Sequence, residues 1–542
     1  MADISTSGWD VVNATDIETL NKIINKNNNY PDNFEQKIKI VGSDFKITGK
    51  WGEWVVINEA SGKDIVMQCF IKSGHATFEG TDYCLNSNNN TQLSSVNIQI
   101  SLEGIETDPE KWFGDDNTSS ITDKTQCHEL VISKNENIII TQTNFTNKEL
   151  YSEDLTYLIE SAFRVWFNDN SESFNQIFSV VLIGLKANKD DFQWLKPSVY
   201  SYSANSSIDK KTTAFGALTL VDGKTEIGDL QQTVDISALQ LVKSFGANAA
   251  LIVSKTMFVK HILLESAVEL IKETTIDDFE ISESGISISN KNEVVWQDFD
   301  GPDNEKMSPI IPKGNFILTL QSDYIHISIV GAHYRPRAGV TVYMSIEQNF
   351  NYKVEKNKNG EPVFVPDEKN LGNATISCSV KMDNWLNWLE LVTGIITSIA
   401  SIIALGTGLA GVIADAAQET VAELEEEQTV RFVFNIFNHS IELEESSFIA
   451  GIAKDILNGV ESNPTIFNVV KIASKVTAVT TGAILSSVIL SDAIYNSIFK
   501  DVPSFQAFSD NFIGAVKWPG IENIELKSAT LADSFVIGLK LD

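Results

Sequence analysis

Apolar and polar residues alternate along several separated stretches of the chain, and this period of two predicts β-strands. The clearest example is VNIQISLE, where Val96, Ile98, Ile100 and Leu102 alternate with polar residues, as in a half-buried antiparallel strand. The same reasoning predicts strands at DFKITGKW, WVVINE, DIVMQCFIK, DYIHISIV, VTVYMSIEQ, ATISCSVKM and ADSFVIGLKL, and a fully buried strand at IFSVVLIGL. Much of the chain is therefore expected to form antiparallel sheet.

Two shorter stretches have a helical period instead. Residues 15–18 have a capping-box pattern, and Ile17, Leu20 and Ile24 recur at helical spacing. A helix is therefore predicted to begin there. A second amphipathic helix is predicted from Leu155, Leu158, Ile159, Ala162 and Trp166. Both helices have one apolar face to bury.

The longest helical signal is ALIVSKTMFVKHILLESAVELIK, which begins at residue 250. Its apolar stripe contains Ile252, Thr256, Val259, Leu263, Ala267 and Leu270, and Phe258 and Ile262 widen it. Such a helix needs a broad apolar partner, and a curved sheet would serve. We expect an α+β fold, and an apolar ligand between sheet and helix would contact Phe258, Val259, Ile262 and Leu263. Ordinary core packing is the alternative for these four side chains.

An apolar region from Trp385 to about Tyr495 follows the β-rich part. Its uncharged segments, 392–414 and 476–490, predict a helical, apolar addition to the fold. We therefore divide the chain into a body (1–383), a hydrophobic, mainly helical insertion (384–500) and a C-terminal segment that returns to the body (501–542).

The segment 392–414 is long enough to cross a bilayer, but its flanks are acidic and lack the lysine and arginine excess that orients a permanent span. A core helical hairpin is the main alternative. A third is a conditional element that meets lipid through Ile395, Ile399, Ile402 and Leu405 when acid protonates the nearby carboxylates at 423–427.

The net charge of −31 limits the classes of partner that the protein can bind. A polyanion with no basic stripe is repelled by phosphate backbones, which argues against nucleic-acid binding. The N-terminus has neither a basic nor an apolar leader region, so we expect a protein of the bacterial cytoplasm or one released without a signal peptide.

The sequence predicts no catalytic site, no metal site and no cofactor. The six histidines have no recognised metal-ligand spacing, and residues 298–303 (DFDGPD) place their glycine too early for an EF-hand loop. Cys127-His128-Glu129 contains catalytic residue types, but neighbours on an extended chain point to opposite faces. Gly223-Lys224-Thr225 lacks the upstream glycine of a phosphate-binding loop and is predicted to be a turn. The cysteines are expected to be free and buried, although a Cys69–Cys84 bridge stays open.

One small cationic feature lies at His333-Tyr334-Arg335-Pro336-Arg337, which holds two of the four arginines. Guanidinium groups bind phosphate through paired hydrogen bonds, so Arg335 and Arg337 are candidates for an anion or lipid headgroup. Pairing with nearby carboxylates is the alternative.

Several motifs resemble the clostridial OrfX / P-forty-seven family. They are Gly8-Trp9-Asp10-Val11-Val12, FNQIFSVVLIGL, Asp191-Phe192-Gln193-Trp194-Leu195-Lys196-Pro197, SYSA, Phe215-Gly216-Ala217-Leu218, the segment ALIVSKTMFVKHILL and Val516-Lys517-Trp518-Pro519. The resemblance extends through most of the chain, but no family motif falls in the apolar region.

This resemblance implies a tubular lipid-binding (TULIP-like) fold, in which a highly curved antiparallel sheet wraps a long helix. It also implies no enzymatic activity and a role as an accessory protein encoded beside botulinum-type or insecticidal toxins. The expected partners are a lipid or other apolar ligand and sister proteins of the toxin cluster. The alternatives are a membrane-permeabilising protein that uses the uncharged segments and a structural scaffold in a toxin complex.

Overall fold

The structure of the chain is a computed structural model, and most of the described residues that have regular structure form β-sheet. The residues described are 3–27, 30–40, 42–87, 91–113, 127–174, 177–182, 193–195, 197–264, 267–268, 271–296, 299–300, 306–337, 340–350, 352–356, 362–366, 374–382, 429–436, 516–521 and 523–542.

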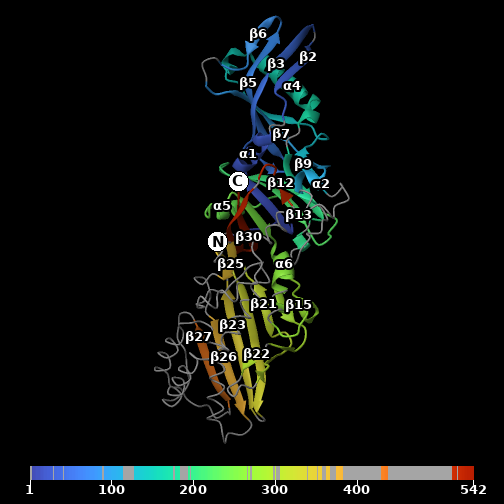
Figure 1. Cartoon of the computed structure of the whole chain (residues 1–542). Coiled ribbons are helices and arrows are strands. Elements are labelled where there is room, and N and C mark those ends of the chain that lie inside the picture. The colour runs from blue at the N-terminus through green and yellow to red at the C-terminus, as the bar shows by residue number, and fades with distance from the viewer. Residues whose placement is uncertain are drawn as a thin grey trace. The chain divides into compact units, whose positions relative to one another are not determined.

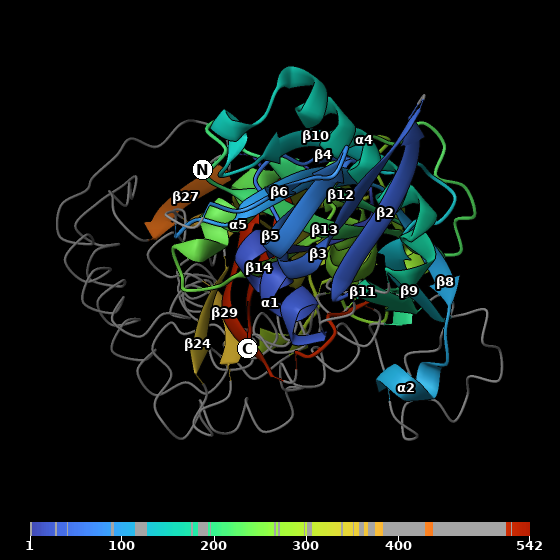
Figure 2. The ribbon, with the colours of Figure 1, turned by 90° about the horizontal axis from the view of Figure 1, so that it is seen from above.

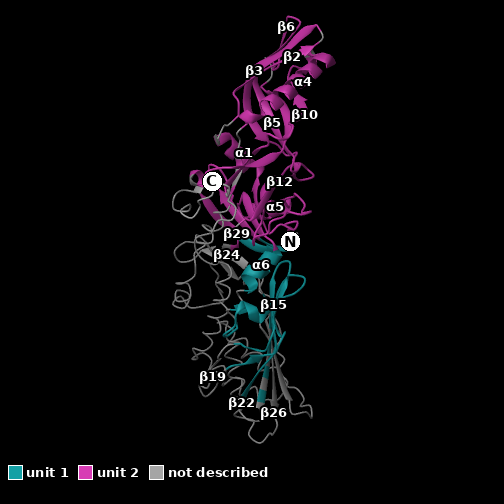
Figure 3. Cartoon of the chain, turned by 90° about the vertical axis from the view of Figure 1, so that its right-hand side faces the viewer, with its two compact units in different colours: residues 1, 255–508, 529–535 teal, residues 2–254, 509–528, 536–542 magenta. Residues whose placement is uncertain are grey.

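The chain divides into two compact units, which Figure 3 colours separately. Unit 2 contains residues 2–254, 509–528 and 536–542, and unit 1 contains residues 255–508 and 529–535. The boundary therefore falls after residue 254. The predicted boundary at residues 383 and 384 lies outside the described residues and stays a prediction.

Unit 2 contains most of a seven-stranded sheet that joins segments far apart in sequence. Its order is β29-β30-β14-β1-β13-β12-β4, and β1 pairs antiparallel with both β13 and β14. All eight residues of β13 are buried. The strands are β1 (Val11–Asp16), β4 (Ser61–Gly62), β12 (Val199–Ser206), β13 (Thr213–Leu220), β14 (Ala249–Val253), β29 (Ile524–Ala532) and β30 (Ser534–Leu541).

A second sheet of unit 2 has the order β10-β7-β5-β3-β2, with β6 paired to β5. Its strands are β2 (Asn33–Ile40), β3 (Ser43–Val56), β5 (Ile65–Phe78), β6 (Thr81–Cys84), β7 (Ser94–Ile100) and β10 (Ile139–Asn144). Helix α4 (Glu153–Asp169) packs against β2, β3 and β10, and Figures 1 and 2 show it beside this sheet. It begins where the Ser152 side chain accepts a hydrogen bond from the Leu155 N–H, and it confirms the helix predicted there.

The remaining sheet of unit 2 has the order β28-β11-β9-β8. Its strands are β8 (Leu102–Glu106), β9 (Cys127–Ile132), β11 (Ile177–Leu182) and β28 (Val516–Lys517). Through β28 the C-terminal segment pairs with β11 of the same unit. Short helices connect the strands of unit 2: α2 (Pro109–Phe113), α5 (Ile236–Lys243) and the 3₁₀ turns η2 (Lys148–Leu150), η3 (Ser171–Ser173) and η4 (Gln193–Leu195).

Helix α1 (Ile17–Asn27) follows β1 directly and confirms the first predicted helix. The cap differs from the prediction by one residue. Asp16, rather than Thr15, accepts the hydrogen bond from a helical N–H, that of Thr19, at 2.9 Å. The Thr15 hydroxyl donates instead to the Asn248 carbonyl, because Thr15 is still paired within β1.

Unit 1 contains a nine-stranded sheet with the order β15-β16-β21-β22-β23-β26-β27, in which β20 pairs with β17 and β22. The long strands β22, β23 and β26 confirm DYIHISIV, VTVYMSIEQ and ATISCSVKM, and Figure 1 shows them side by side. The strands are β15 (Phe279–Ile281), β16 (Ser287–Asn290), β17 (Val294–Val295), β20 (Ile310–Ile311), β21 (Phe316–Leu320), β22 (Ile325–Arg337), β23 (Val340–Phe350), β26 (Ala374–Met382) and β27 (Thr429–Ile436).

Two isolated hairpins complete the described strands: β18 (Phe299–Asp300) with β19 (Lys306–Met307), and β24 (Tyr352–Lys356) with β25 (Pro362–Pro366). The 3₁₀ turn η6 (Ile276–Asp278) precedes β15. Strand β27 lies within the range predicted to be a helical insertion, so that part of it is sheet. The other residues from 384 to 500 lie outside the described part of the chain.

The long helix predicted from residue 250 is wrong in its first part. Residues 249–253 form β14 inside the seven-stranded sheet, and the helix begins only at Lys255, as α6 (Lys255–Phe258) followed by the π turn η5 (Val259–Leu263). All five residues of β14 are buried. A strand covered on both faces has an unbroken apolar run, which periodicity cannot distinguish from a buried helix.

Candidate functional site

The four residues predicted to contact an apolar ligand lie at the helix of unit 1. Phe258, Val259, Ile262 and Leu263 are all buried, and none is more than 2% exposed. The Phe258 ring packs against Phe535 with 5.0 Å between centroids, and the π turn contacts β16. Their neighbours are those of a packed core, so contact with a ligand stays a prediction.

The arginine motif lies on β22 of the nine-stranded sheet. Arg335 is exposed, whereas the side chain of Arg337 lies outside the description. The neighbouring Tyr334 is buried, and the His333 ring lies 5.6 Å from that of Tyr343. Arg335 is thus accessible to an anion, and an anion contact stays a prediction.

The predicted membrane contacts Ile395, Ile399, Ile402 and Leu405 lie outside the described residues. Among the helices that the structure does describe, none has the length and apolarity that crossing a membrane requires.

Cys127, His128 and Glu129 are adjacent on β9, and each has different partners. The His128 Nδ1 lies 2.7 Å from the Tyr200 hydroxyl. Burial, together with the charges of Glu129 and Asp108, raises the pKa of the Cys127 thiol to about 12. A thiol that stays protonated is a poor nucleophile.

Glu129 is a buried carboxylate with three hydrogen-bond donors on one oxygen. Its Oε1 accepts from the Thr107 hydroxyl at 2.7 Å, and from Lys111 Nζ and Trp112 Nε1 at 2.8 Å each. Burial alone would raise the pKa of Glu129, but these hydrogen bonds and the Lys111 charge outweigh it and lower the pKa. The arrangement fixes α2 on the sheet.

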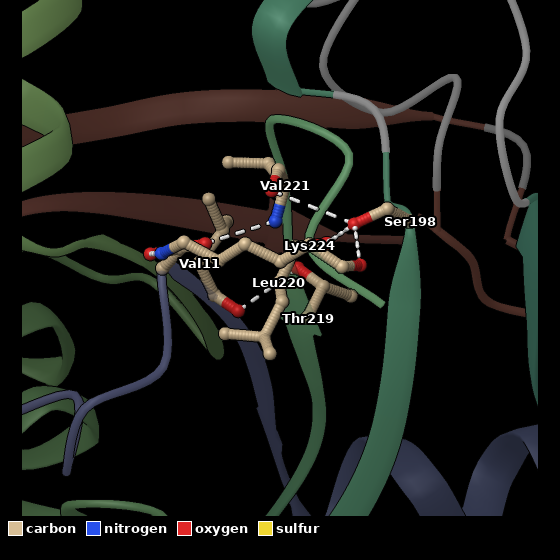
Figure 4. A network of polar contacts seen from close by, with 7 residues as sticks. Val11, Ser198, Thr219, Leu220, Val221 and Lys224 are labelled. Atoms are coloured by element: carbon tan, nitrogen blue, oxygen red, sulfur yellow. Dashed lines mark hydrogen bonds and ion pairs between the residues drawn. The ribbon is translucent and has the colours of Figure 1, made fainter. Parts of the chain in front are cut away.

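Gly223-Lys224-Thr225 is part of a turn, as predicted. Asp222 and Gly223 both have positive φ, and the Lys224 N–H donates to the Val221 carbonyl. The Lys224 ammonium lies 2.6 Å from Asp10 Oδ1, whose other oxygen accepts from the Val221 N–H at 2.9 Å. Figure 4 shows Ser198 donating to backbone carbonyls of the same turn. The lysine thus pairs with a buried carboxylate rather than with a phosphate.

Metal ligation finds no support in the described part of the chain, where histidine, cysteine and carboxylate side chains form no group of three suited to a metal. His326 Nδ1 lies 2.7 Å from Asn349 Oδ1, and the two residues are directly opposite each other on β22 and β23. The His326 ring therefore has a cross-strand hydrogen-bond partner. Residues 298 and 301–303 of the predicted acidic loop lie outside the described residues.

An aromatic cluster that the sequence reasoning missed lies between α4 and the β2–β3–β5 part of its sheet. Neighbouring rings of this cluster have centroids 5.1–5.9 Å apart, and its members are Phe34, Trp51, Trp54, Phe163, Trp166, Phe167 and Phe174. The register of β3 against β5 shifts between Lys50 and Trp54. This bulge brings Trp51 and Trp54, three residues apart, into the same interior, which a regular strand would not do.

The bare backbone of two glycines accommodates the edge of this aromatic cluster. Gly49 on β3 pairs with Gly74 on β5, and the Phe34 ring lies over both. A Cβ atom at Gly49 would lie 2.3 Å from Phe34 Cζ, and one at Gly74 would lie 2.8 Å from it. The glycines are therefore required for the ring to enter.

Two polar atoms inside the aromatic cluster lack hydrogen-bond partners. The indole nitrogens of Trp51 and Trp54 are buried and have no acceptor, although the side chains are 4% and 0% exposed. A buried donor without an acceptor costs about 1–3 kcal/mol, and aromatic ring faces are only weak acceptors. The aromatic cluster therefore has apolar walls and two unused N–H groups.

Comparison with known proteins places the chain in a family. The family described as "OrfX-like: Protein OrfX2/OrfX3/P47" matches residues 6–437. The chain belongs to this OrfX/P47 family. Its similarity to Protein OrfX3 of Paraclostridium bifermentans is 26% identity over 432 residues, which cover 74% of this chain and 84% of that protein. Protein OrfX3 of Clostridium botulinum (strain Kyoto / Type A2) is 24% identical over 293 residues, covering 51% and 57% of the two chains.

Solved structures of the family share the fold. P47 from Clostridium botulinum A2 superposes with a TM-score of 0.59 at 16% identity, covering 99% of this chain and 98% of that one. P47 of Clostridium botulinum E1 gives a TM-score of 0.58 at 15% identity and covers 99% of both chains.

Several residues of the motifs that carry the family resemblance pack inside unit 2. Trp9 is fully buried and its indole N–H donates to the Gln231 carbonyl, while Asp10 binds the turn after β13. Gly216 lies in β13, where a Cβ would approach Val234 to 2.7 Å. Trp518 packs edge-on against Phe215. These residues have structural roles.

Proposed function

We propose that this member of the OrfX/P47 family is a non-enzymatic accessory protein of a toxin gene cluster that binds a lipid or another apolar ligand. The proposed architecture is TULIP-like, with α4 as the helix that a curved sheet wraps. Two findings support this: the family membership, and the packing of α4 against three strands of one sheet.

The observation that carries the proposal is the pair of unpaired indole N–H groups of Trp51 and Trp54. Their surroundings are aromatic, so an apolar chain or ring system would be favourable there. A ligand with a carboxyl, ester or hydroxyl oxygen at one end would satisfy the two donors while its apolar part displaced or joined the rings. This is the chemistry of a fatty acid or a related lipid.

Substitution of Trp51 and Trp54 by Phe tests this. Each change removes an N–H and keeps an aromatic ring. A net hydrogen bond contributes about 1 kcal/mol, so we expect each substitution to weaken binding of a fluorescent fatty acid by about fivefold. The stability of the ligand-free protein should fall little, because a donor without a partner is removed. Trp296→Phe, a buried tryptophan of unit 1, is the matched control and should bind as the wild type does.

Equal affinity in the wild type and both variants would contradict the assignment of the aromatic cluster. Absence of binding by the wild type, or of co-purifying lipid in native mass spectrometry, would contradict lipid binding itself. Ring-like oligomers on liposomes would favour the membrane-permeabilising alternative, whose segments at 392–414 and 476–490 lie outside the described residues. An empty protein that binds only a sister protein would favour a scaffold.

A further inference from the structure

A thiol, an imidazole and a carboxylate meet on the hairpin of β5 and β6. The antiparallel register pairs His75 with Cys84 and Thr77 with Asp82, so all four side chains are on one face of the hairpin. Cys84 Sγ lies 3.6 Å from His75 Nδ1, and Asp82 Oδ2 lies 3.0 Å from the same nitrogen. The Thr77 hydroxyl donates to the other oxygen of Asp82 at 3.0 Å.

This thiol differs from the others whose surroundings are described. Cys84 is free and exposed, whereas Cys69 and Cys127 are free and buried, with the pKa of each raised mainly by burial. Among the described strands, β6 pairs with β5 alone, and the exposed Cys84 lies at this edge of the sheet. A reagent in solution can therefore approach Cys84 without opening the fold.

The backbone at Cys84 is held in place from a second element. Its carbonyl accepts hydrogen bonds from the Tyr151 hydroxyl at 2.5 Å and from Asn147 Nδ2 at 3.0 Å. These residues flank η2, so the thiol is presented on a fixed strand end rather than on a free loop. The distance between Sγ and His75 is set by these contacts and by the strand pairing.

An imidazole and a carboxylate lie beside the thiol. The Asp82 carboxylate contacts Nδ1 and orients the imidazole ring, and an imidazole 3.6 Å from a thiol can take up its proton as the thiolate forms. The charged groups of adjacent elements include Lys148 and Glu149 on η2, and Lys46, which lies opposite Thr77 on β3 and forms an ion pair with Glu35. The Tyr151 hydroxyl, whose pKa is raised to about 12 mainly by burial, is neutral at pH 7, and Asp82 contributes a negative charge beside the imidazole.

We propose that Cys84 is a modification site that exchanges with low-molecular-weight disulfides, with His75 stabilising the attacking thiolate and Asp82 positioning His75. The Cys84 thiolate attacks one sulfur of the disulfide R–S–S–R, and a new Sγ–S bond forms as the old S–S bond breaks. The second sulfur leaves as RS⁻ with the electron pair and takes a proton from water. Cys84 is oxidised to a mixed disulfide and one R–S group is reduced to its thiol.

The test is incubation of the folded full chain with oxidised glutathione near pH 7, followed by peptide mass mapping of all four cysteines over time. We expect Cys84 to acquire glutathione first. His75→Gln should slow this reaction about threefold or more, since an exposed ion pair of this kind has an effect of that order. Asp82→Asn should slow it to a smaller extent. Asp44→Asn, which removes an exposed, ion-paired carboxylate from β3 of the same sheet, is the control and should react as the wild type does.

Two results would overturn the proposal. One is faster modification of Cys69, Cys127 or Cys378 than of Cys84 in the folded protein. The other is an unchanged Cys84 rate in both His75→Gln and Asp82→Asn, which would show exposure alone to be responsible. Because His75 and Asp82 are about half exposed, both variants are expected to fold, and far-ultraviolet circular dichroism checks this. The inference is independent of lipid binding.

Discussion

Glu129 is a buried carboxylate. One of its two oxygens, Oε1, accepts hydrogen bonds from Thr107, Lys111 and Trp112. Its pKa is lowered in the folded protein, because the hydrogen bonds and the lysine charge outweigh the effect of burial. A lowered folded pKa means that the carboxylate contributes stability above the unfolded pKa. That contribution is lost as the pH falls through the folded pKa.

We therefore predict that Glu129→Gln lowers the free energy of unfolding at pH 7 by about 1.5–3 kcal/mol, the range for hydrogen bonds to a charged group. The variant should also lose less stability than the wild type between pH 5 and the acid limit. Urea unfolding at several pH values measures both effects. Glu106→Gln, an exposed carboxylate on the adjacent strand β8, is the control. Parallel pH profiles for wild type and Glu129→Gln would contradict this account.

At the residue scale, the sequence indicates which face of a strand a side chain lies on better than it indicates which groups meet. Alternation on β9 places His128 on the face opposite to Cys127 and Glu129, and the Glu129 charge acts on the Cys127 thiol. The meeting of His75 with Cys84 depends on the register of a hairpin whose two-residue turn, Glu79-Gly80, lacks the Asn-Gly or Asp-Gly pair that marks such turns. The meeting of Trp51 with Trp54 depends on a bulge, and a bulge has no pattern in the residues that flank it here.

At the scale of single elements, α1 depends on a cap placed where a strand becomes a helix. Asp16 is 5% exposed, its Oδ1 accepts from the Thr19 N–H, and its Oδ2 lies 3.4 Å from Lys243 Nζ on α5. One side chain therefore closes the first turn of α1 and fixes α5 beside it.

Asp16→Ala should lower the free energy of unfolding by about 1–2 kcal/mol, since it removes both the cap and the ion pair. Asp16→Asn retains an oxygen for the cap, so its loss should be less than half as large. Thermal or urea unfolding of the three proteins measures this. A loss for Asn as large as that for Ala would assign the effect to the charge instead of the cap.

Helices and strands were largely predictable where one face of the element is buried and the other is exposed to solvent. Strands β22, β23 and β26 of unit 1 and helices α1 and α4 have such patterns, and each was predicted near its observed place. Strand β14 was mistaken for helix because its five residues are apolar on both faces. Strand β27 was missed although Val430, Phe432, Phe434 and Ile436 recur with a period of two, because the apolar character of the surrounding region led to a helical prediction for the whole range.

At the scale of the whole molecule, the fold depends on strands that are distant in sequence. Unit 2 draws on three separate segments, and the two strands that pair with β1 come about 200 and about 240 residues later in the chain. Sequence patterns identify strands but not their partners, so this topology could not be derived from the chain alone. The ligand contacts predicted at Phe258 stay a prediction, and the two unpaired indole donors at Trp51 and Trp54 could not be derived from the sequence for the same reason.

The measurement that tests the central claim most directly is photolabelling of the purified protein with a photoactivatable fatty acid, followed by peptide mass mapping. The account predicts label on the peptides that contain Trp51 and Trp54 and on the facing peptide from Phe163 to Phe174, and competition by unlabelled fatty acid. Label confined to other parts of the chain, or no label that unlabelled fatty acid can displace, would contradict it.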